Sequence, residues 1–151
     1  MGSMQQLTFV EAKKLEWREV NKPQLESGID AIVKPIAVAR CDLDYFIAVG
    51  KYRTPGPFAI GHEMSAVVTE VGDGVSDFQP GDRVIVPFQI SCGVCINCQR
   101  GWTNACSEVS ALAAYGLGTH PNGEYGGALS DYVRVPFADH MLVRLPDTLS
   151  A

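Results

Sequence analysis

The sequence predicts a mainly β domain, folded as a barrel or a sandwich, with few and short helices. Its apolar segments are short, and they either alternate with polar residues or are rich in Val and Ile, as strands are. Turn-forming stretches such as "FQPGD" separate these segments. With 151 residues, 46% of them apolar and 19% charged, the chain is long enough for one domain with its own core.

The strands can be placed one by one. In chain order the expected strands are "KLEWREV" (14–20), "IDAIVKPIAVA" (29–39), "MSAVVTEVG" (64–72), "RVIVP" (83–87), "ALSDYVRV" (128–135) and "HMLVRLP" (140–146). Pro35 cannot donate a hydrogen bond to a neighbouring strand, so it indicates an edge or a bulge in the second of them. The only helix that we expect before residue 147 is "DLDYFIAV" (42–49), and Asp147 is a candidate cap for another.

Composition excludes several classes of protein. The net charge of -5 argues against nucleic acid as the main partner, and no apolar run approaches the roughly 18 residues that a membrane span needs. The start, "MGSMQQL", has neither the basic nor the apolar part of a secretion signal. We interpret residues 1–3 as an expression scar, residues 4–151 as the domain, and the protein as cytoplasmic. In that compartment clustered cysteines are more often metal ligands than disulfides.

Four of the five cysteines lie within fifteen residues. Cys92, Cys95, Cys98 and Cys106 have the spacing C-x2-C-x2-C-x7-C, which lets tight turns aim four thiolates at one point. Four thiolates complete a tetrahedral shell, as in structural zinc sites, and we expect such a lobe at about residues 90–108. A bacterial iron–sulfur run would continue with an x3 gap and Cys-Pro, whereas here the gap is seven and Ser107 follows. Unrelated buried thiols are the remaining alternative. A closed shell has no position for a substrate, so the chemistry must lie elsewhere.

A second set of metal-binding residue types surrounds the remaining cysteine. Cys41 directly precedes the expected helix, whose N-terminus favours a thiolate. His62 and Glu63 stand at the head of an expected strand, and the three together would form an incomplete shell, as in catalytic zinc sites. Asp44 is a candidate for orienting a ligand. Spacing alone leaves open a core cysteine and an ordinary polar histidine.

The order of these motifs resembles the zinc-dependent medium-chain alcohol dehydrogenases, specifically their N-terminal GroES-like catalytic domain. The family's zinc signature, G-H-E-x2-G-x5-G-x2-V, appears as "GHEMSAVVTEVGDGV", with Ala66 where a glycine is usual. Cys41 stands before the signature, and "GDRV" and the four-cysteine cluster follow it. The likeness runs from about residue 30 to residue 147. It implies a partly open GroES-like β-barrel with short helices and a structural-zinc lobe.

The resemblance also implies roles for single residues. Cys41 and His62 match the first two ligands of the family's catalytic zinc, and Glu63 matches the neighbouring carboxylate. The family's last zinc ligand and its NAD(P)-binding Rossmann domain would lie beyond residue 151, and no G-x-G-x-x-G stands after a strand here. We therefore expect a truncated oxidoreductase that is inactive alone. The full-length protein would act on an alcohol, a polyol or a carbonyl with NAD or NADP, as a homo-oligomer without membrane or nucleic-acid partners.

One stretch departs from the family pattern. Family members usually read C-G-[ST]-D-x-H, in which the hydroxyl and the histidine begin a proton relay, whereas this chain reads "CDLDYF". Leu43 replaces the hydroxyl residue and Phe46 the histidine, and a leucine transfers no proton. The proton would then leave through a water on the metal, through Glu63, or through a tyrosine such as Tyr45. The alternative is a zinc-stabilised binding or scaffold module that has lost the chemistry.

Overall fold

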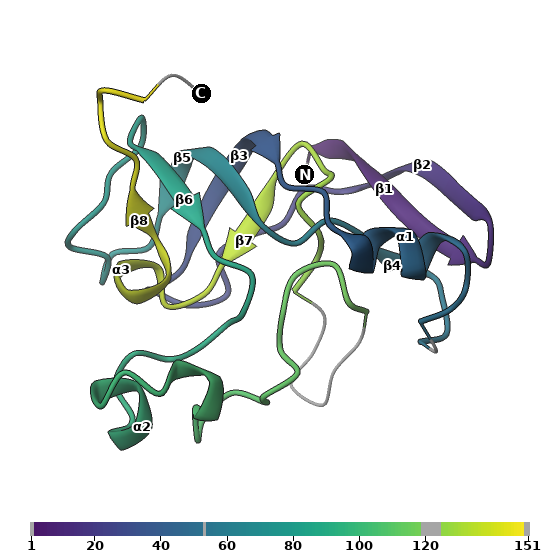
Figure 1. Cartoon of the computed structure of the whole chain (residues 1–151). Coiled ribbons are helices and arrows are strands. Elements are labelled where there is room, and N and C mark those ends of the chain that lie inside the picture. Colours follow the sequence, from purple (N-terminus) through teal and green to yellow (C-terminus); the bar gives the residue numbers. More distant parts are fainter. Residues whose placement is uncertain (1, 53, 119–124, 150–151) are drawn as a thin grey trace.

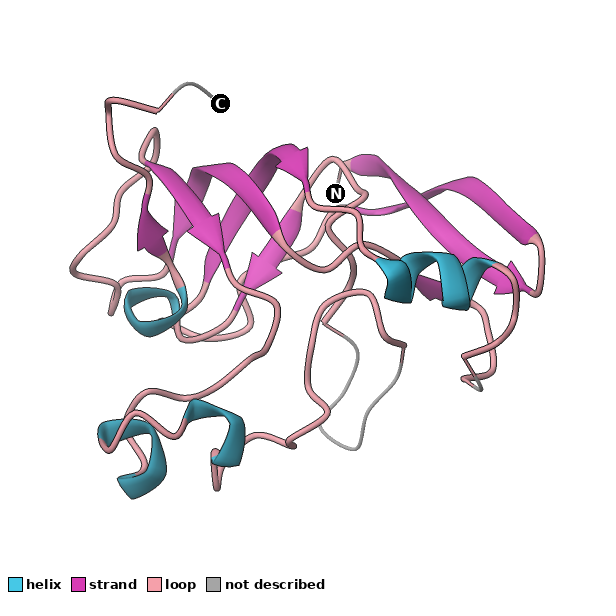
Figure 2. Ribbon diagram, in the orientation of Figure 1, coloured by secondary structure: helices cyan, strands magenta, loops and turns pink. Residues whose placement is uncertain are grey.

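The computed structural model describes residues 2–52, 54–118 and 125–149 and confirms a mainly β domain (Figure 1, Figure 2). One sheet has three strands in the order β2-β1-β4, and the other has five in the order β7-β3-β5-β6-β8, with every pair antiparallel. The strands are β1 (Ser3–Glu11), β2 (Lys14–Asn21), β3 (Ala31–Val38), β4 (Phe58–Ala59), β5 (Met64–Val71), β6 (Arg83–Val86), β7 (Val133–Val135) and β8 (Val143–Arg144).

Most of the expected strands are present, with shifted bounds. The segments 14–20, 29–39, 64–72 and 83–87 correspond closely to β2, β3, β5 and β6. The last two shrink to the short strands β7 and β8, and the first two residues of the segment 140–146 belong to a helix over residues 138–141. Strand β1 was not expected, and it begins within the segment interpreted as a scar, where Ser3 pairs with Asn21. The register of β3 against β5 shifts between Pro35 and Ala37, so the bulge expected at the proline is confirmed.

Helices are short and lie outside both sheets. Helix α1 (Asp42–Ala48) confirms the expected helix, and α2 (Ile96–Gln99), the 3-10 helix η1 (Thr103–Ala105) and α3 (Ala138–Met141) add to it. The expectation of a single helix before residue 147 was therefore wrong, because single turns inside loops have no apolar periodicity to reveal them. Asp147 lies in a turn, in which Leu149 N donates to Pro146 O at 3.0 Å. None of the described helices has the length and apolar character that would let it cross a membrane.

The buried residues form two clusters. The larger cluster contains buried side chains of the five-stranded sheet, such as Val33, Met64 and Val84. It also includes Cys92 and Cys98. The smaller cluster joins α1 to the three-stranded sheet through Phe9, Ile47 and Phe58. The four-cysteine segment therefore packs on the first cluster, whereas the helix that follows Cys41 packs on the second.

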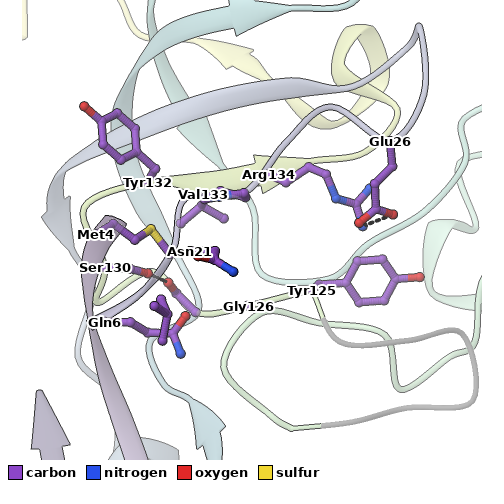
Figure 3. A pocket seen from close by; sticks show the side chains of 13 residues that line it. Met4, Gln6, Asn21, Glu26, Tyr125, Gly126, Ser130, Tyr132, Val133 and Arg134 are labelled. Carbon is purple, nitrogen blue, oxygen red and sulfur yellow. Dashed lines mark hydrogen bonds and ion pairs between the residues drawn. The ribbon is translucent and has the colours of Figure 1, made fainter. Parts of the chain in front are cut away.

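A buried ion pair connects β7 to the segment that leads into β3. Asp30 is 2% exposed, and its carboxylate accepts the backbone N–H groups of Glu26 and Ser27 as well as the Arg134 guanidinium at 3.1 Å. Arg134 also lies 3.0 Å from the Glu26 carboxylate, as Figure 3 shows. Both groups border a hollow of about 250 Å³ next to Tyr125 and Ser130. Because Arg134 is engaged by two carboxylates, the described residues that line this hollow present no free cation for an anionic ligand.

Candidate metal centres

The four clustered cysteines converge as the sequence predicts. The Sγ atoms of Cys92, Cys95, Cys98 and Cys106 all lie within 4.8 Å of one another, and those of Cys95 and Cys106 are 4.0 Å apart. Sulfur ligands at about 2.3 Å from a tetrahedral zinc would be about 3.8 Å apart, whereas a disulfide needs about 2.05 Å. All five cysteines are free thiols. The cluster therefore has the dimensions of a closed zinc site.

Backbone N–H groups and burial set the acidity of these thiols in opposite directions. N–H donors from Ser107 and Cys98 lower the pKa of Cys95 to about 5. Burial, together with the neighbouring cysteines, raises the pKa of Cys98 to about 11. Cys95 therefore loses its proton more readily than an ordinary cysteine. Four thiolates at this distance repel one another, and a bound cation would offset that repulsion.

The cluster occupies a lobe that stands apart from the strands. Figure 1 shows α2 and its flanking loops away from both sheets. Cys95 caps α2, and its Sγ accepts the N–H of Cys98 at 3.5 Å, while Cys92 Sγ accepts the N–H of Cys95 at 3.4 Å. The x2 gaps of the sequence thus become one tight turn in which Cys92 and Cys95 each accept a backbone N–H from the next ligand.

The solitary cysteine belongs to a second group. One donor atom each of Cys41, Asp44 and His62 lies within 4.8 Å of the other two. Cys41 is exposed, whereas His62 is 7% exposed and the Asp44 side chain is 12% exposed. A thiol, a carboxylate and an imidazole form a donor set that zinc accepts in open sites. The structure therefore joins three residues that come from two segments of the sequence.

Helix α1 fixes the first two of these residues through its N-terminal cap. Cys41 is the N-cap, and its Sγ accepts the N–H of Leu43 at 3.3 Å. Asp44 completes a capping box, because its Oδ2 accepts the N–H of Cys41 at 2.8 Å. The same carboxylate thereby orients the segment that bears the thiol, which supports the orienting role expected for Asp44.

The second oxygen of Asp44 lacks a hydrogen-bond partner. Asp44 Oδ1 lies 3.3 Å from His62 Nδ1, a distance for an ion pair when the imidazole is protonated. The contact does not meet hydrogen-bond geometry, and Oδ1 is buried without another partner. A buried carboxylate oxygen without a partner is costly, and a cation or a protonated imidazole would relieve it. This oxygen is the strongest sign that the group is built for a cation.

Contacts with a distant segment hold His62 in place. Gly61 has φ +96, and a Cβ there would lie 2.7 Å from Leu129 N, so this position requires a glycine. Ala128 N donates to Gly61 O at 2.9 Å and Leu129 N donates to Ile60 O at 3.1 Å. The "GH" pair is thus positioned by backbone contacts that no local pattern reveals.

An aromatic ring and an apolar groove adjoin the second group. The Phe88 ring meets the His62 ring edge-on, with centroids 5.3 Å apart and planes at 81°. Sequence reasoning missed Phe88, whose only signal was its place after the strand "RVIVP". A groove of about 330 Å³, with Leu7, Tyr45 and Leu129 in its walls, reaches Asp44.

Glu63 does not join the second group. Its side chain is exposed, and its backbone oxygen accepts the N–H of Ala39 at 2.9 Å, which links β5 to the residues before Cys41. Among the described residues, Asp44 supplies the carboxylate that lies with Cys41 and His62. The role of Glu63 as a ligand stays a prediction.

Comparisons with known proteins show the family of this chain. The family described as "Alcohol dehydrogenase GroES-like domain" matches residues 27–147. The chain is 32% identical over 149 residues to the zinc-type alcohol dehydrogenase-like protein AdhB of Bacillus subtilis, with 96% of this chain covered. It is 32% identical over 146 residues to the glutathione-independent formaldehyde dehydrogenase of Pseudomonas aeruginosa, with 94% covered.

Solved structures show the same relationship. An alcohol dehydrogenase from Thermus superposes with a TM-score of 0.86 at 35% identity, over 97% of this chain and 41% of that one. A zinc-dependent alcohol dehydrogenase from Streptococcus gives 0.80 at 31% identity, over 98% and 40%. This chain spans 39% of the Bacillus relative and 36% of the Pseudomonas relative. The likeness therefore covers nearly all of this chain and well under half of each relative.

Proposed function

Because the chain belongs to the alcohol dehydrogenase family and carries its GroES-like domain, we propose that it is the catalytic domain of a zinc-dependent alcohol dehydrogenase. The full protein would oxidise an alcohol or a polyol, or reduce a carbonyl, with NAD or NADP. The nucleotide-binding part would lie outside these 151 residues. We also propose a cytoplasmic homo-oligomer for the full protein.

The observation that carries this proposal is the convergence of Cys41, Asp44 and His62, with the Asp44 Oδ1 atom buried and unpartnered. Zinc held there would polarise the substrate oxygen, and the nicotinamide would exchange a hydride with the substrate. Cys41 and His62 would hold the metal. Asp44 would orient both, because its two oxygens contact the backbone N–H of Cys41 and the ring of His62.

Proton release would follow a route different from the family's usual relay. Leu43 packs on the apolar cluster around Ile47, and Phe46 lies between Tyr45 and Lys51, so neither supplies a proton carrier. Tyr45 is 60% exposed and directly follows Asp44, while the exposed Glu63 directly follows His62. We propose that one of these two groups passes the proton to solvent.

The four-thiolate lobe would have a structural role. A closed tetrahedral shell accepts no substrate, and the lobe has no strand among its described residues to hold it. Zinc there would link residues 92–106 into one unit and stabilise them against unfolding.

Metal binding tests the proposal. We expect the chain to retain one zinc against a chelator and to bind a second metal ion more weakly, which a cobalt titration detects through thiolate absorption. Cys41→Ser and His62→Ala should remove the second ion and leave the first. The 151-residue chain alone should turn over no alcohol with NAD or NADP. Turnover by it, or a second ion unaffected by both substitutions, contradicts the proposal.

A second candidate is a zinc-stabilised binding or scaffold module. Leu43 and Phe46 favour it, because they stand where the family's proton relay begins. This module would need only the closed site. One zinc per full-length chain favours the module, and two favour the enzyme.

A further inference from the structure

Helix α3 contacts the residue that leads into the four-thiolate lobe. Ser91 is 2% exposed, and its Oγ lies 2.8 Å from Nε2 of His140. Its backbone N–H points to the Sδ of Met141, the next residue of the helix, at 3.4 Å. Ser91 directly precedes the zinc ligand candidate Cys92. Because Ser91 is buried, a substrate cannot reach its hydroxyl, and we interpret the contact between Ser91 and His140 as structural.

The same histidine also covers the residue after Cys92. Gly93 has φ +78, and a Cβ there would collide with the imidazole ring of His140. The ring is therefore packed directly on the Gly93 backbone. Cys92, which is 3% exposed, lies between the two residues that His140 contacts. One side chain thus fixes both chain neighbours of one thiol.

Helix α3 is itself anchored to the rest of the domain. Ala138 N donates to Ile29 O at 2.8 Å. The Asp139 carboxylate accepts the N–H of Ser76 at 2.9 Å and of Asp77 at 3.0 Å. His140 therefore projects from an element that two other segments of the domain hold in place.

We propose that His140, acting through Ser91 and Gly93, is a positioning residue that keeps Cys92 in the zinc shell. The other three ligands lie on or next to α2 and η1 inside the lobe, whereas Cys92 stands at its entrance. A ligand at the entrance is the one that backbone motion can most readily withdraw, and a shell that loses one thiolate releases its metal faster. The proposal rests on the closed zinc site proposed above.

Zinc release tests this role in the 151-residue chain. Ser91→Ala removes the hydroxyl, and His140→Leu removes the hydrogen bond while it keeps bulk against Gly93. Changes to residues that orient metal ligands alter metal affinity by about 10- to 100-fold, so we expect both variants to lose zinc to a chelating dye about tenfold faster than the unmodified chain. His140→Gln, which retains a group able to reach Ser91, should recover part of the difference. The cobalt-loaded variants should show a shifted thiolate absorption.

Thr69→Val is the matched control, because it removes a partly buried hydroxyl hydrogen bond, from Thr69 Oγ1 to Ile32 O at 3.0 Å, that involves neither α3 nor the lobe entrance. Thermal unfolding of all four variants separates general destabilisation from metal positioning. Zinc release by Ser91→Ala and His140→Leu at the rate of Thr69→Val overturns the proposal, whatever their melting temperatures. Unmodified protein that holds no tightly bound zinc overturns the closed site itself and this role with it.

Discussion

The two metal groups of this domain differ in where their ligands come from. The four-thiolate group takes all its donors from residues 92–106, and short turns bring them together. The second group joins Cys41 and Asp44, at the start of α1, to His62, which precedes β5. The first is complete by itself and lies in a lobe without strands. The second forms only when the loop before β5 meets the cap of α1.

This difference suits the two groups to different roles, one in the stability of the domain and the other in the proposed reaction. A closed shell of four thiolates can link a lobe but leaves no position for a substrate. An incomplete shell keeps positions open, at the cost of a buried carboxylate oxygen without a hydrogen-bond partner. In the proposed function, the ligands that are neighbours in sequence stabilise the fold, and the ligands that the fold brings together from two segments serve the reaction.

Loss of a buried thiol should produce the largest effect. Structural zinc contributes about 10–16 kcal/mol in zinc-finger peptides, so a substitution that abolishes tight binding should cost more than about 3 kcal/mol, a quarter of that contribution. Cys98 is 7% exposed and central to the cluster, so Cys98→Ser should lower the melting temperature and abolish tight zinc binding. Calorimetry and zinc analysis measure both.

Cys41→Ser is the reference for that experiment. It belongs to the open group, so it should retain the tight zinc and change the melting temperature little. Equal destabilisation by the two substitutions would contradict the assignment of structure to one group and chemistry to the other.

A smaller effect should follow from the charge of Asp44. Asp44→Asn keeps an oxygen for the Cys41 cap but removes the negative charge near His62. We expect the second cobalt ion to bind about 10- to 100-fold more weakly, as when other residues that orient metal ligands are changed. Asp42→Asn, in the same first turn but outside the group, should leave the affinity unchanged. Equal loss in both variants would point to the helix terminus and not to the metal group.

The contrast also explains how far the sequence could be read. The x2 gaps made the thiolate cluster visible, since its ligands are neighbours along the chain. Cys41 and His62 were a weaker prediction from residue types, which the family resemblance strengthened, because 20 residues stand between them and their contact depends on the fold. The links from Ile60 to Leu129 and from Ser91 to His140 were invisible, because they join segments far apart in the sequence. Strand β1 was missed although residues 4–11 lay within the segment interpreted as the domain, because "MQQLTFVE" does not alternate strictly between apolar and polar residues.

Substitution of two glycines should strain the backbone next to each metal group separately. Gly61 and Gly93 both have positive φ, at +96 and +78, and a side chain at either would collide with a neighbour. Gly61→Ala and Gly93→Ala should each cost about 1–3 kcal/mol, the usual range for such backbone strain. The first should weaken only the second metal ion, and the second should speed zinc loss from the lobe. Metal titrations would contradict the independence of the two groups if Gly61→Ala affected the lobe zinc, or if Gly93→Ala affected the second metal ion.

The smallest effect concerns the thiols of the metal-free cluster. The pKa of Cys95 is lowered to about 5 and that of Cys98 is raised to about 11. Because the thiolate is the reactive form, the folded, metal-free chain at pH 7 should be alkylated at Cys95 before Cys98. The preference should weaken as the pH falls toward 5, where Cys95 takes up its proton, and it should vanish in the denatured chain, where both thiols have ordinary pKa values near 8.5. Peptide mapping by mass spectrometry gives the order of labelling. Labelling of Cys98 first would mean that the backbone donors of Ser107 and Cys98 do not act on Cys95 without metal, and that the cation alone organises the lobe.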